Sequence, residues 1–189
     1  LWRVVMDPNT AVEKMVASDK NLFSIDQGGK IARGWSSVDG SLLWETLLPL
    51  SQDNRPMVDE YPVAISADQD RVRVLALNSL FYLDSSSGDV SKSYSAPSGV
   101  VLSSLVISDS ANDVADSNLR AAVGCKVGSK AISLADTKCL KPVIVETNAK
   151  TLASTIRELS KLPVSVLSLQ VICSQNTGSF QTSDIMVGV

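Results

Sequence analysis

Histidine is absent from all 189 residues of the chain. Its absence removes the usual general base, the commonest zinc ligand and the group that most often activates serine or cysteine nucleophiles. Cysteine is scarce as well, since only Cys125, Cys139 and Cys173 occur and none has the C-x-x-C spacing of zinc ribbons or thioredoxin-type motifs. Cys125 and Cys139 are candidates for a disulfide, although an odd count leaves the redox compartment open. We therefore expect no catalytic residues, no metal site and no cofactor-binding residues.

An excess of basic residues is also missing. The chain has 17 Lys and Arg against 20 Asp and Glu, a net charge of -3. Nucleic acid is not an expected partner, because binding to phosphates requires clustered cations. Long apolar runs are lacking too, and none approaches the roughly 20 residues that cross a bilayer. With 44% apolar residues, the chain can still bury a substantial core, and we predict a single domain over residues 1–189, an internal piece of a longer protein.

Short apolar segments separated by Gly, Ser, Asp and Asn predict an all-β protein. Gly28 and Gly29 supply the positive φ angles of a tight hairpin, and Gly40 and Gly88 predict turns of the same kind. The predicted strands cover residues 22–26, 30–36, 42–48, 62–66, 71–77, 80–84, 90–94, 100–108, 119–125, 131–135, 143–147, 164–173 and 180–187.

A repeat becomes visible when the turns are aligned. Gly40 and Gly88 are 48 residues apart, and Cys139 follows Gly88 by 51. An apolar residue precedes each of these positions by five residues, at Trp35, Leu83 and Leu134. A period of about 40 to 50 residues with roughly four short strands is typical of a β-propeller blade.

A second tryptophan position recurs more weakly in the repeat. Trp2 and Trp44, each preceded by leucine, are 42 residues apart, and Lys92 takes the corresponding place in the next unit. Trp35 and Trp44 would suit stacking on a sugar or an aromatic cofactor. Their fixed distance from a turn glycine instead favours packing between neighbouring blades.

The repeat length predicts about four blades of four antiparallel strands, which is a partial propeller. Open blade edges then favour self-association of the chain. A β-sandwich is the competing architecture, because its short strands look similar without the long period.

One segment departs from the β pattern. Leu152, Ile156 and Leu159 recur at helical spacing, and Pro163 ends the run. We predict a short amphipathic helix near 150–162, inserted between blades, with a partner-binding helix as the alternative.

Three stretches resemble known sites but are interpreted as ordinary turns or loops. Residues 124–130, GCKVGSK, have too few residues between the glycines for a phosphate loop, and serine precedes lysine. Acidic residues at 53, 59 and 60 favour a solvated loop over a catalytic pair. The pair Asp68 and Asp70 lacks the downstream glycine and glutamate of a calcium loop.

Residues 22–45, LFSIDQGGKIARGWSSVDGSLLWE, resemble a known family. A Gly-Gly-basic-Ile-x-basic-x-Trp run is followed by Gly-x-Leu-x-Trp-Glu, and residues 1–3, Leu-Trp-Arg, resemble the tail of a preceding blade. These runs are similar to the amino-terminal luminal propellers of subunit 1 of the endoplasmic reticulum membrane protein complex. The matched positions are Gly28, Gly29, Lys30, Ile31, Arg33, Trp35, Gly40, Leu42, Trp44 and Glu45.

This resemblance implies a function that composition alone does not suggest. The implied role is a non-catalytic scaffold in a complex that inserts tail-anchored and multi-pass membrane proteins and aids their folding. The implied location is the endoplasmic reticulum lumen, within a membrane-anchored subunit, with the other subunits and client membrane proteins as partners. The positions expected to be structural in the repeat are Trp2, Gly28, Gly29, Trp35, Gly40, Trp44, Leu83 and Gly88.

Two alternatives remain beside this interpretation. Such blades also resemble pyrroloquinoline-quinone-type repeats of bacterial alcohol dehydrogenases and of outer-membrane assembly lipoproteins. A fragment of a quinone-dependent dehydrogenase would be an enzyme, whereas a fragment of an outer-membrane assembly propeller would be a second kind of scaffold.

Overall fold

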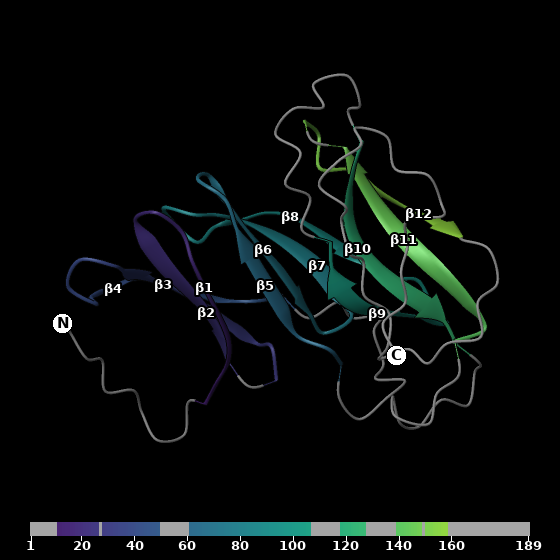
Figure 1. Cartoon of the computed structure of the whole chain (residues 1–189), viewed down its shortest axis with the longest axis horizontal. Helices are drawn as coiled ribbons and strands as arrows, with labels where there is room; N and C mark the ends of the chain where they lie inside the picture. Colours follow the sequence, from purple (N-terminus) through teal and green to yellow (C-terminus); the bar gives the residue numbers. More distant parts are fainter. Residues whose placement is uncertain are drawn as a thin grey trace, which may run out of the picture. The chain divides into compact units, whose positions relative to one another are not determined.

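The computed structural model describes residues 11–26, 28–49, 61–106, 118–127, 139–148 and 150–158 (Figure 1). These residues form twelve strands in three four-stranded antiparallel sheets, each consistent with one propeller blade. The predicted all-β class is confirmed. No helix among the described residues is long and apolar enough to cross a membrane.

Two compact units contain these sheets. The first unit holds two sheets, and in each the strand order follows the chain. The first sheet consists of β1 (Val12–Ala17), β2 (Asn21–Asp26), β3 (Ile31–Ser36) and β4 (Leu42–Leu47). The second consists of β5 (Ala64–Ala67), β6 (Arg71–Ala76), β7 (Ser79–Asp84) and β8 (Val90–Ser95).

A shared apolar core joins the two sheets of the first unit. The inner strands of each sheet supply most of it, because both faces of a central blade strand are covered, whereas the outer strands β4 and β8 are largely exposed. The buried members of this core are Phe23, Ile25, Ala32, Trp44, Leu48, Val63, Val72, Val74, Ala76, Phe81 and Leu83.

The second unit holds the third sheet. Its strands are β9 (Val100–Leu105), β10 (Asn118–Lys126), β11 (Lys141–Asn148) and β12 (Ser154–Glu158), again ordered along the chain. Apolar residues occupy the middle of its inner strands β10 and β11, as expected for strands buried on both faces. Val101, Leu102, Ala122, Val143 and Val145 are fully buried.

The helix predicted near 150–162 is wrong over the described residues, where β12 lies instead. Leu152 has a left-handed φ of 54°, which ends any α-helical path through this position. From Ser154 onward the chain pairs with β11, and the hydroxyl groups of Ser154 and Thr147 lie 2.8 Å apart. The cross-strand bonds and the β-branched Thr155 and Ile156 outweigh the apolar spacing that suggested a helix.

The strand predictions divide into two groups, and one further strand besides β12 was not predicted. Ten of the thirteen predicted segments overlap a described strand, whereas 131–135, 164–173 and 180–187 lie outside the described residues. The first strand, β1, was missed because VEKMVA mixes charged and apolar residues and exposes most of its side chains. The three described sheets correspond to three of the about four predicted blades, and the strands predicted for a further blade lie outside the described residues.

Candidate functional site

Three hairpin turns are built in the same way, at residues 36–41, 84–89 and 148–153. In each, a side-chain oxygen of the first residue accepts the N–H groups two and three residues later. The fifth residue donates its N–H to the carbonyl of the first and has positive φ. That fifth residue is Gly40, Gly88 or Leu152, with φ of 74°, 76° and 54°.

The third turn corrects the repeat inferred from sequence spacing. Cys139, which was aligned with Gly40 and Gly88, lies just before β11, and Leu152 occupies the equivalent position 64 residues after Gly88. The unit is longer because 12 residues separate β9 from β10 and 14 separate β10 from β11. The corresponding connections in the second sheet have 3 and 2 residues.

The carboxylates of Asp39 and Asp84 accept hydrogen bonds from groups of their own turns. The backbone N–H of Ser41, then the hydroxyl groups of Ser36 and Ser41, lower the pKa of Asp39 to about 2. The Ser86 hydroxyl and the backbone N–H of residue 87 lower the pKa of Asp84. Both carboxylates therefore stabilise their turns as anions, and neither is placed as a proton donor near neutral pH.

Trp44 contacts the 84–89 turn of the neighbouring sheet. Its indole Nε1 donates a hydrogen bond of 3.0 Å to the carbonyl of Ser85, and the hydroxyl of Thr46 donates one of 2.7 Å to the carbonyl of Gly88. A Cβ atom at Gly88 would come within 2.5 Å of the indole ring. This turn therefore needs glycine for two reasons, its positive φ and the close approach of the tryptophan.

The other side of the Trp44 ring packs against residues of its own sheet. Gly34 faces Trp44 in the register, and a Cβ atom there would overlap the indole. The Phe23 ring stacks on it with centroids 5.8 Å apart. At the same register position of the second sheet, Tyr82 faces Lys92, so Lys92 takes the place of Trp44 and the bulky residue moves to the neighbouring strand.

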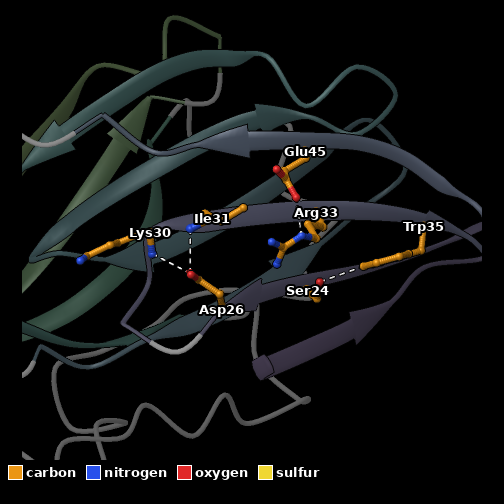
Figure 2. A network of polar contacts seen from close by, with 7 residues as sticks. All are labelled: Ser24, Asp26, Lys30, Ile31, Arg33, Trp35 and Glu45. Atoms are coloured by element: carbon orange, nitrogen blue, oxygen red, sulfur yellow. Dashed lines mark hydrogen bonds and ion pairs between the residues drawn. The ribbon is translucent and has the colours of Figure 1, made fainter. Parts of the chain in front are cut away.

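Trp35 belongs to a polar network on the first sheet (Figure 2). Its Nε1 donates a 2.9 Å hydrogen bond to the hydroxyl of Ser24, and the residue is 8% exposed. Beside it, Nε of the buried Arg33 lies 2.7 Å from a carboxylate oxygen of the half-exposed Glu45. Each of these pairs joins adjacent strands, which is a structural use of the tryptophan and of the ion pair.

The glycine pair before β3 forms a turn capped by Asp26. One carboxylate oxygen of Asp26 accepts the N–H groups of Lys30 and Ile31, each at 2.7 Å (Figure 2). Gly28 and Gly29 have φ of 89° and 67°. A Cβ atom on Gly29 would lie 2.7 Å from the Cβ of Ala76, whereas nothing lies within 4 Å of one on Gly28.

The cysteines lie in the second unit. A disulfide of 2.06 Å joins Cys125 of β10 to Cys139, with the Cα atoms 5.3 Å apart. Both residues are buried. Cys173 lies outside the described residues.

Stretches resembling known sites are explained by backbone geometry where they are described. A carboxylate oxygen of Asp68 accepts the N–H groups of Asp70 and Arg71, as in an ordinary polar turn. Residues 124–126 continue β10, while 128–130 and the acidic residues at 53, 59 and 60 lie outside the described residues. The described part of the chain contains no group of three or more potential metal ligands.

The structure thus brings together only some of the residues singled out in the sequence. Trp44 and Gly88 meet, while Leu83 is buried in the shared core and Trp2 lies outside the described residues. Sequence reasoning missed Gly34 and Ser85, which complete the surroundings of Trp44. A glycine in the middle of a strand was the available signal for Gly34, because such a residue often marks the close approach of a bulky group.

Comparison with protein families supplies the context for this arrangement. Residues 1–181 match the family described as the EMC1 N-terminal beta-propeller domain. The chain belongs to this family. The resemblance found in residues 22–45 is thereby confirmed, and the three four-stranded antiparallel sheets are consistent with propeller blades of this family.

Solved structures resemble the chain at low sequence identity. BamB from Moraxella catarrhalis is 14% identical with a TM-score of 0.48, and the match covers 86% of this chain and 55% of that one. The WD40 domain of SCAP from fission yeast is 13% identical with a TM-score of 0.38, covering 87% of this chain and 36% of that one. The chain thus spans about half the length of the BamB structure. No curated protein matches.

Proposed function

We propose that the chain is a non-catalytic scaffold domain of the endoplasmic reticulum membrane protein complex. The family match over residues 1–181 carries this proposal, and the family has no known catalytic activity. The domain acts in the endoplasmic reticulum lumen, within a membrane-anchored subunit. Its partners are other subunits and client membrane proteins, so its part in inserting tail-anchored and multi-pass proteins is to hold components in place.

The buried disulfide supports the luminal location. Disulfides persist in oxidising compartments such as the endoplasmic reticulum lumen and are rare in the cytosol. The bond between Cys125 and Cys139 ties β10 to the residue that leads into β11. Because both cysteines are buried and the bond joins β10 to the chain just before β11, the disulfide is suited to a structural role.

Exposed apolar side chains supply a surface for protein contacts. Isolated exposed apolar residues are ordinary, whereas apolar residues that neighbour one another on one strand can form an interaction site. The exposed Leu43 and Leu47 of the edge strand β4 are such a pair, because residues four apart on a strand lie on the same face. Five of the six large exposed apolar residues in the described part of the chain belong to the first sheet and its turn, and the sixth is Leu140. The five are Met15, Val38, Leu42, Leu43 and Leu47.

The polar groups of the described residues also favour a scaffold. Asp26 and Asp68 bond to backbone N–H groups, and Glu45 pairs with Arg33. Each of these charges stabilises the fold by local contacts. None combines with a nucleophile and a base in a way that would support acid–base or nucleophilic catalysis.

Affinity purification of the full-length subunit tests the scaffold role. We expect Leu43→Asp with Leu47→Asp to reduce the amount of other complex subunits recovered with it and the insertion of a tail-anchored protein. Leu140→Asp is the matched control, because Leu140 is also exposed but lies in the second unit. Unchanged recovery in the double variant would refute the surface, and dye-linked dehydrogenase activity after adding pyrroloquinoline quinone and calcium would refute the non-catalytic role.

A further inference from the structure

The open edge of the first sheet presents backbone groups that its own strands do not use. Among the described residues, β4 is the last strand of this sheet and pairs with β3 on one side. The N–H of Leu48 bonds to the carbonyl of Lys30, which precedes β3, and successive residues of an antiparallel strand direct their backbone groups alternately to its two sides. The N–H and C=O groups of Glu45 and Leu47 therefore point to the open edge, where another extended chain can bond to them.

The side chains beside these backbone groups are apolar, acidic and apolar in turn. Trp44 and Thr46 bond to the second sheet, so residues 43, 45 and 47 lie on the opposite face of β4. Leu43 is 47% exposed and Leu47 73%, and the exposed Glu45 lies between them. The edge thus combines free backbone groups with two leucines that are accessible from the same side.

The last strands of the other two sheets differ from β4. The exposed middle of β8 is Ser-Lys-Ser, residues 91–93, and β12 ends in Arg157 and Glu158, which both form ion pairs. Polar and charged side chains on an edge strand discourage the addition of a further strand. The single charge of β4, on Glu45, is paired with Arg33 of its own sheet and has an exposed leucine on either side. Of the three, β4 is the edge best suited to accept another strand.

Glu45 determines which kind of segment fits this edge. One of its oxygens lies 2.7 Å from Nε of Arg33 (Figure 2), and no other described residue bonds to this half-exposed carboxylate. A second copy of β4 fits poorly, because the antiparallel register that places Leu43 opposite Leu47 also places Glu45 opposite Glu45. Like charges directly opposite each other destabilise a sheet, whereas a Lys or Arg opposite Glu45 stabilises it.

We propose that β4 binds an extended segment of another subunit as a fifth strand of the first sheet. The segment bonds to the backbone groups of Glu45 and Leu47, and its alternate residues are apolar, basic and apolar, opposite Leu47, Glu45 and Leu43. The proposal rests on the scaffold role proposed above, because the segment comes from a partner within the complex.

Hydrogen exchange in the purified complex tests the strand pairing. The complex is recovered through a tag on the full-length subunit, and exchange is resolved to single residues by mass spectrometry. We expect the N–H groups of Glu45 and Leu47 to exchange at least tenfold more slowly in the complex than in the subunit purified alone. Ser93, at the register position of Glu45 in the second sheet, is the control and should exchange equally in both.

Two outcomes of this measurement are distinguishable. Recovery of the other subunits without protection of Glu45 and Leu47 would overturn the strand pairing and leave the scaffold role intact. Recovery of the subunit alone would refute the scaffold role and the strand pairing with it.

A proline substitution separates backbone pairing from side-chain contact. Leu47→Pro removes an N–H that points to the open edge, where an edge strand tolerates proline. Leu47→Val is the matched control, because it keeps both the N–H and an apolar side chain. We expect Leu47→Pro to abolish the slow exchange of Glu45 in the complex and Leu47→Val to preserve it. Slow exchange in both variants would overturn the pairing, and if Leu47→Pro fails to fold, the exchange of the unaltered complex decides.

The charge of the segment is tested at Glu45. Glu45→Gln keeps an oxygen that accepts a hydrogen bond from Arg33 but removes the negative charge. We expect the N–H of Leu47 to exchange at least threefold faster in the complex of this variant than in the unaltered complex. Equal exchange in the two complexes would overturn the basic residue of the segment.

Discussion

Trp44 shows at the scale of a single residue how one side chain joins two blades. A buried tryptophan removes roughly 150–250 Å² of surface from water, more than other side chains in a small core. Its ring is enclosed by Gly34, Gly88 and Phe23, and its N–H is satisfied by the carbonyl of Ser85. Both the apolar and the polar requirements of the residue are met inside the protein, which leaves no part of it for a ligand.

We expect Trp44→Ala to lower the free energy of unfolding by about 3–5 kcal/mol, because a large cavity forms between the two sheets. Trp44→Phe keeps most of the ring and should cost less. Lys92→Ala, at the same register position of the next sheet, is the control and should change stability by less than about 0.5 kcal/mol. Urea denaturation measures all three, and a small effect of Trp44→Ala would contradict the packing role.

A methyl group at Gly34 should destabilise the protein without removing any contact. The added Cβ overlaps the indole of Trp44, and overpacking of this kind costs about 1–3 kcal/mol. In a Trp44→Phe background, Gly34→Ala should be less harmful, because the smaller ring leaves room. Equal effects of Gly34→Ala in both backgrounds, measured by thermal unfolding, would show that the clash is relieved elsewhere.

At the scale of elements, β12 is an edge strand fixed by its cross-strand partners. Glu158 forms ion pairs with Lys126 of β10 and Lys141 of β11, and Arg157 forms one with Glu146 of β11. The hydrogen bonds from Lys126 and then Lys141 lower the pKa of Glu158 to about 2. These exposed ion pairs fix the position of β12 beside β11. They contribute little to the free energy of unfolding, because water screens them.

Acid should loosen β12 within a defined pH range. The folded pKa of Glu158 lies below its unfolded value of about 4.3, so its contribution is present above pH 4.3 and is lost as the pH falls towards 2. Hydrogen exchange of the backbone N–H groups of residues 154–158 should therefore speed up between pH 4 and 2, after correction for intrinsic rates. Glu158→Gln should abolish this pH dependence. If the exchange rates of the variant still change with pH in the same way, another group is responsible for the pH dependence.

The disulfide should stabilise the third sheet by restricting the unfolded chain. Cys125 and Cys139 are 14 residues apart, and closing a loop of about this length is worth about 3 kcal/mol. We expect Cys125→Ser with Cys139→Ser to lower the free energy of unfolding by about that amount. A reductant should have the same effect on the unaltered chain and none on the double variant, and a reductant effect that persists in the variant would contradict this assignment.

Sequence patterns predicted these elements unequally, for physical reasons. The turns at Gly40 and Gly88 were predictable because glycine is the residue best suited to positive φ. The third turn was not, since Leu152 adopts that conformation and Asn148 supplies the capping oxygen. The first strand was not predicted because its charged residues obscure the apolar pattern. The strand β12 was predicted as a helix because its apolar spacing fits both a helix and a strand.

At the scale of the whole molecule, long-range contacts were the least predictable feature. Trp44 and Ser85 are 41 residues apart and meet only because two sheets stack. The repeat of the sequence suggested that such a contact exists between blades, but not which carbonyl accepts the indole. Family membership then gives the stacked blades a biological setting that no side chain of the described residues indicates by its chemistry.

Cross-linking of the purified membrane protein complex tests the scaffold role most directly. The complex is recovered through a tag on the full-length subunit, treated with an amine-reactive cross-linker and analysed by mass spectrometry. We expect Lys14 and Lys30, exposed on the first sheet, to cross-link to other subunits. Recovery of the subunit alone, or links confined to this chain, would contradict the scaffold role.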